Sequence, residues 1–66
     1  MVDDDDMDTL VLHFYAAIDV KDLATAATLL QQMQQVVKDD PTNANLTSLQ
    51  MAEYILNIAR EYRKSV

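Results

Sequence analysis

The sequence predicts an all-α protein: an antiparallel helical hairpin with an additional N-terminal helix, together a small three-helix bundle. Gly is absent and Pro occurs once in 66 residues, which disfavours the many tight turns of a small β fold. Apolar residues recur at helical spacing in three segments. The single Pro lies between the last two segments, and so short a connection makes two helices antiparallel neighbours.

The first expected helix covers residues 7–18. It is more hydrophobic than an isolated surface helix should be, so it must be buried. Two arrangements satisfy this requirement: the helix closes the open side of the hairpin, or it packs against another chain. Its apolar stripe consists of Met7, Leu10, Val11, Phe14 and Ile18.

The second expected helix begins at Val20 or Lys21 and ends at about Asp39. Asp19 is its expected N-cap, with Asp22 as the acidic partner of a capping box. The alternative is one continuous helix through Asp19, because neither Gly nor Pro interrupts the chain there. The apolar residues follow two neighbouring lines, which are Leu23, Ala27, Leu30 and Val37, and Ala26, Leu29, Met33 and Val36.

The third expected helix runs from about residue 44 to residue 64. Pro41 ends the preceding helix because it lacks an amide hydrogen and restricts the residue before it. Thr42 or Asn43 then caps the new helix through its side-chain oxygen. The apolar band is broad enough to need two neighbours. One line consists of Met51, Ile55, Ile58 and Tyr62, and the other of Leu49, Ala52, Leu56 and Ala59.

Composition limits the class of protein. Residues 1–6 are expected to form an acidic disordered tail, and residues 7–66 a single helical domain. The net charge of −6 opposes nucleic-acid binding, which depends on basic side chains. No apolar run approaches the ~20 residues of a membrane span, and the acidic N-terminus is unlike a signal peptide. A cytoplasmic location is therefore expected.

No catalytic, cofactor-binding or metal site is predicted. His13 is the only imidazole, and no serine or cysteine lies near it in the chain. Glu53 and Glu61 lack the ExxH motif of di-metal bundles. The four consecutive aspartates at residues 3–6 lack the alternating spacing of a calcium loop. We therefore expect neither an enzyme nor a small-molecule substrate.

The apolar bands are broader than one hairpin can bury, which predicts a protein–protein interaction or oligomerisation module. Tyr15, Tyr54 and Tyr62 are aromatic candidates for such an interface, because a phenol can pack its ring and still reach water. The predicted interface residues are Leu10, Phe14, Leu30, Met33, Met51, Ile55, Ile58 and Tyr62.

The turn KDDPTN at residues 38–43, followed by Leu46, Gln50 and a helix with Tyr and Arg, resembles the helix-turn-helix of type III secretion needle subunits. The resemblance covers about residues 29–62, without the second turn proline of that family and without its further amphipathic segment. The size and hairpin plan are also similar to the small co-chaperones of needle subunits. Both resemblances imply a protein partner and a helix-packing function in a bacterial cytosol.

The ending Asp40-Pro41-x-Asn43 is similar to the close of a tetratricopeptide helix pair, without the aromatic and Gly positions of that repeat. This resemblance implies the alternative function: a self-contained structural domain of a larger protein, with no binding or catalytic role.

Overall fold

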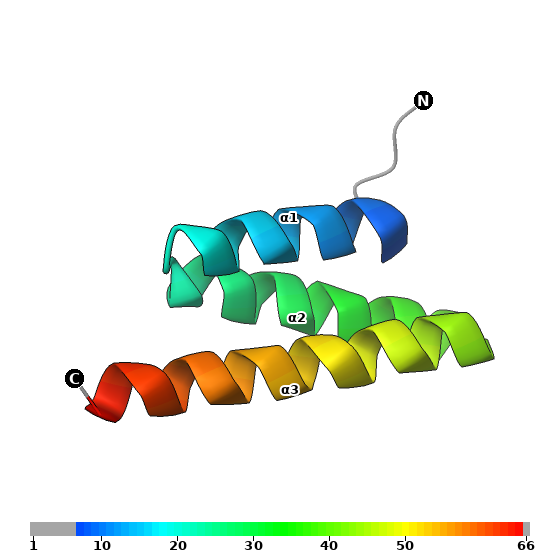
Figure 1. The fold of residues 1–66 in the computed structure, drawn as a ribbon. Helices are drawn as coiled ribbons and strands as arrows, with labels where there is room; N and C mark the ends of the chain where they lie inside the picture. Colours follow the sequence, from blue (N-terminus) through cyan, green and yellow to red (C-terminus); the bar gives the residue numbers. More distant parts are fainter. Residues whose placement is uncertain (1–6, 66) are drawn as a thin grey trace.

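The computed structural model describes residues 7–65, which form three helices (Figure 1): α1 (Met7–Asp19), α2 (Leu23–Asp39) and α3 (Asn43–Ser65). Successive helices run in opposite directions, so α1 and α3 are parallel to each other. The predicted all-α three-helix bundle is confirmed. The tail expected at residues 1–6 lies outside the described residues.

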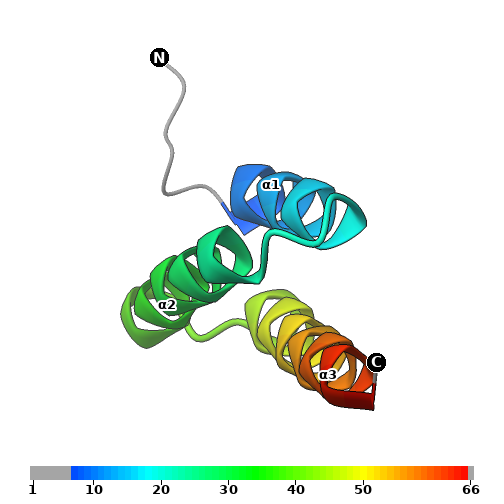
Figure 2. The ribbon, with the colours of Figure 1, turned by 90° about the vertical axis from the view of Figure 1, so that its left-hand side faces the viewer.

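The three helices are not packed equally against one another. Seen end-on, α1 and α3 both lie against α2 (Figure 2). The α1–α2 contact is the most extensive and the α1–α3 contact the least. The first helix therefore closes the core chiefly through α2, and its junction with α3 is the weakest side of the bundle.

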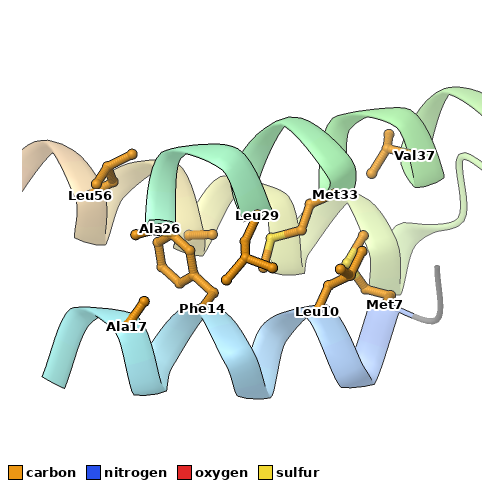
Figure 3. Packing of buried hydrophobic residues seen from close by; sticks show 10 residues of the cluster. Met7, Leu10, Phe14, Ala17, Ala26, Leu29, Met33, Val37 and Leu56 are labelled. Atoms are coloured by element: carbon orange, nitrogen blue, oxygen red, sulfur yellow. The ribbon is translucent and has the colours of Figure 1, made fainter. Parts of the chain in front are cut away.

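The core is aliphatic with one aromatic ring. Phe14 and Met33 are fully buried, and the Phe14 side chain points from α1 toward Ala26 of α2 (Figure 3). The α1 stripe is confirmed in part, since Val11 and Ile18 are only half-buried while Ala17 is buried. The buried side chains are Met7, Leu10, Phe14, Ala17, Ala26, Leu29, Met33, Val37, Ala52 and Leu56.

The break between α1 and α2 is confirmed, but the predicted N-cap was wrong. Asp19 is the last residue of α1, and Asp22 caps α2. The Asp22 carboxylate accepts hydrogen bonds from the Thr25 backbone N–H at 3.3 Å and from the Thr25 hydroxyl at 2.6 Å. The capping partner is therefore a threonine three residues on, and both of these bonds lower the pKa of Asp22 from its usual 3.8.

Asp22 is placed there by the way α1 ends. The Asp22 N–H donates to the Ala17 carbonyl at 2.8 Å, and the Lys21 N–H donates to the Ile18 carbonyl at 3.0 Å. These two bonds form a Schellman motif, whose C′ residue takes the left-handed conformation. Lys21 occupies that position with φ of 62°, which carries a steric cost for any residue with a Cβ atom.

The turn between α2 and α3 follows the prediction. The Asp40 N–H donates to the Val36 carbonyl at 2.8 Å and ends α2. Of the two candidate caps, Thr42 is the one used, since its hydroxyl accepts from the Asn45 N–H at 3.1 Å. The Asn45 side chain also donates to the Asp40 carbonyl at 2.9 Å, so polar groups on both sides of Pro41 fix the reversal.

Candidate protein-interaction surface

An apolar groove of about 490 Å³ lies between the last turn of α1, the start of α2 and the C-terminal half of α3. It lies at the junction of α1 and α3, the pair of helices with the least extensive contact. We call it the α1/α3 groove. Its lining consists of Ile18, Lys21, Leu23, Ile55, Ile58, Ala59 and Tyr62.

The lining determines what the α1/α3 groove can bind. Lys21 is its only charged residue and the phenol of Tyr62 its other polar group. The Lys21 ammonium and the Tyr62 phenol are the titratable side chains of this lining. Apolar walls with one cation at the rim suit the apolar side chains of an amphipathic helix.

The Schellman motif that ends α1 brings Lys21 to the groove. Because Lys21 is in the left-handed conformation, the chain reverses within three residues and Leu23 begins α2. One short turn therefore forms the wall of the groove opposite α3. Ile18 precedes this turn, Lys21 lies within it and Leu23 follows it.

A row of exposed apolar side chains runs along α3 beside the groove. Met51 is 50% exposed, Tyr54 64%, Ile58 48% and Tyr62 70%. Their spacing of three, four and four residues places them on one face of the helix. We call these four residues the α3 stripe. Ile58 and Tyr62 belong to both the stripe and the groove, so the two features form one continuous apolar surface.

The structure divides the predicted interface residues into two groups. Leu10, Phe14 and Met33 lie in the protein's own core, and Leu30 packs half-buried against it. The remaining four lie on α3, where Ile55 is half-buried and the others are exposed. Of these four, the groove brings together Ile55, Ile58 and Tyr62, whereas Met51 lies outside its lining.

The sequence did not reveal the opposite wall of the groove. The apolar patterns predict that Ile18 and Leu23 face the core and that Lys21 lies at the start of the second helix. Only the Schellman ending places them together beside α3. The three tyrosines predicted as interface candidates, Tyr15, Tyr54 and Tyr62, are all exposed.

His13 is exposed. No group of His, Cys, Asp and Glu in residues 7–65 is arranged to hold a metal ion. No polar or charged side chain is buried in the part of the chain with described side chains. Among the described helices, none is both long and apolar enough to cross a membrane.

The chain was compared with protein families, with curated proteins and with solved structures. None of the three comparisons finds a match.

Proposed function

We propose that this protein is a small interaction module that binds an apolar helix at the α1/α3 groove. One observation carries the proposal: the groove continues into the exposed α3 stripe, so the molecule presents an apolar surface on the side where its own packing is weakest. Soluble monomers rarely expose contiguous apolar patches larger than a few hundred Å² unless the patch binds something.

The surface has the dimensions of a helix-binding site. Met51 and Tyr62 at the ends of the stripe lie eleven positions apart, which is ~16 Å or three helical turns at ~1.5 Å per residue. A bound helix of that length presents anchors at positions i, i+3 or i+4, and i+7. The partner we propose is therefore an amphipathic helix of at least three turns.

The resemblance of residues 29–62 to needle subunits adds a partner class to the proposal. Needle subunits and their co-chaperones associate by packing helices, which is the kind of binding that an apolar groove favours. A type III secretion component is accordingly the first partner to test by co-purification.

Photo-crosslinking in the producing cell tests the proposal. A benzoylphenylalanine at Tyr62 should cross-link to protein, because this position lies in both groove and stripe. The matched control is the same probe at Leu12, which is 69% exposed on α1. Cross-linking at position 62 and not at position 12 supports the proposal. Equal yields at both positions, or none at 62, contradict it.

The alternative is a structural domain without a binding role, and the completeness of the core supports it. Phe14 and Met33 are fully buried within the monomer. The variant Ile58→Asp separates the two functions, since Ile58 is 48% exposed. An interaction module keeps its thermal melt and loses the Tyr62 cross-link in this variant. A purely structural domain has no such cross-link to lose.

A further inference from the structure

We propose that the occupant of the α1/α3 groove is a second copy of this chain, packed through α3 in an antiparallel dimer. This inference rests on the proposed function and names its partner. In the dimer, Met51 of each copy lies against Tyr62 of the other, and the two-fold axis passes between Ile55 and Ile58.

The first argument is that α3 carries both halves of a self-complementary surface. The groove lies at its C-terminal half, where Ile58, Ala59 and Tyr62 form one wall. Met51 and Tyr54 project from the N-terminal half, outside the groove lining, and are at least half exposed. A two-fold interface requires the same patch on both copies to fit itself. Rotation about the axis between Ile55 and Ile58 places the projecting residues of each copy in the groove of the other.

The second argument is the spacing along α3. In an antiparallel pair, residues whose numbers add up to a constant face each other, and here the constant is 113. Met51 then pairs with Tyr62, Ile55 with Ile58, and Tyr54 with Ala59. Each apolar residue meets an apolar residue, and the large ring of Tyr54 meets the smallest side chain of the groove. In a parallel pair each residue would instead face the same residue of the other copy. Tyr54 would face Tyr54, and neither Met51 nor Tyr54 would face the groove.

The third argument is the area available. A tyrosine ring carries ~150–250 Å², so Tyr54 and Tyr62 at their observed exposures offer roughly 200–350 Å² per copy. Half-exposed Met51 and Ile58 add about 60–120 Å². Two copies therefore bury roughly 500–950 Å² before the groove walls are counted. A specific interface needs about 1,000 Å² in total, so the stripe supplies roughly half to nearly all of that area, and Ile18, Leu23, Ile55 and Ala59 of the groove add to it.

An interface at this low end of the size range is typical of weak, transient complexes, so we expect a weak dimer. Two chains of net charge −6 also repel each other, so added salt should strengthen the dimer by screening. The stripe itself carries no charged residue, and the dimer therefore buries no unpaired charge from it.

The first experiment measures the mass of the full chain by light scattering from 5 µM to 1 mM. The wild type should shift from monomer to dimer within this range. Ile58→Asp should stay monomeric, while the control Leu12→Asp, an equally drastic change at an exposed site on α1, should dimerise normally. A wild type that is monomeric throughout overturns the proposal, as does an Ile58→Asp variant that dimerises like the wild type.

Disulfide trapping then tests the register. The chain contains no cysteine, so Met51→Cys and Tyr62→Cys each introduce a unique thiol. In the antiparallel dimer the mixed pair can form a disulfide. Two copies of either variant alone hold their thiols ~16 Å apart along the helix, beyond the ~7 Å limit between Cα atoms. A mixed disulfide that is lost when Ile58→Asp is added to both variants supports the proposal. Disulfides within each variant alone, or none at all, overturn it.

The outcomes also separate this inference from the proposed function. If the chain stays monomeric to 1 mM while position 62 cross-links to a different protein in the cell, the dimer is refuted and the interaction module stands. If position 62 cross-links to nothing, both proposals fail.

Discussion

Replacing Lys21 by glycine should raise the free energy of unfolding, although the change removes a side chain from the α1/α3 groove. Lys21 is the C′ residue of the Schellman motif that ends α1, with φ of 62°. The two hydrogen bonds of that motif use backbone atoms alone, at 3.0 Å and 2.8 Å. They therefore survive the substitution.

The magnitude follows from two opposing terms. A residue with a Cβ atom pays about 1–2 kcal/mol in the left-handed region, and glycine does not. Glycine loses more backbone freedom on folding, which costs about 0.5–1 kcal/mol. The net gain is about 0.5–1 kcal/mol. At about 4–8 °C per kcal/mol for a domain of this size, the Tm should rise by about 2–8 °C.

The assay is thermal unfolding followed by circular dichroism at 5 µM, the lowest concentration of the light-scattering series. Lys21→Ala is the matched control, because it also removes the lysine side chain but keeps the Cβ atom. Lys21→Gly should melt above both the wild type and Lys21→Ala. If the glycine and alanine variants melt at the same temperature, the backbone of residue 21 is not strained and the reasoning is wrong.

Two further predictions concern the cap and the core. Because the pKa of Asp22 is lowered in the folded protein, this cap stabilises the fold above the usual aspartate pKa and less as pH falls below about 4. Asp22→Asn should therefore lose less stability than the wild type between pH 5 and pH 2 in urea unfolding, and equal losses would refute this. Phe14→Ala removes a fully buried ring and should cost about 3–5 kcal/mol, a large part of the ~3–10 kcal/mol of a chain this long. Its far-ultraviolet circular dichroism should show much lower helicity at 37 °C than that of Leu12→Ala, and native helicity in Phe14→Ala would contradict the assigned core.

The two turns differ in how far the sequence predicts them. Pro41 cannot continue a helix, and Thr42 follows it directly as a cap, so local chemistry determines the α2–α3 reversal. The α1–α2 turn has no such residue. Asp19 and Asp22 are both good caps by type, and the choice depends on Thr25 and on a left-handed residue that is a lysine. Because the usual glycine is absent, the sequence carries little signal for that ending.

The periodicity of α3 does not determine which of its two apolar lines faces the core. Its two apolar lines are equally regular in sequence, yet Ala52 and Leu56 of one line are buried while Met51 and Ile58 of the other are largely exposed. The space between α1 and α2 is already occupied by Phe14 and Met33, so the line with the small alanine faces it. This choice depends on the volumes of the α1 and α2 side chains that face α3. The sequence of α3 alone does not specify those volumes.

The length of α3 explains why an apolar line is left over. With 23 residues it is ~35 Å long, whereas α1 with 13 residues is ~20 Å. A helix that much shorter cannot cover the whole α3 face beside it. Polar residues at the stripe positions would cost the monomer little, because Met51, Tyr54, Ile58 and Tyr62 are 48–70% exposed. Lysine or glutamate would also favour the helix more than tyrosine or isoleucine do. The folding of one copy therefore does not account for these four side chains, and this is the reason why we propose helix binding at this face.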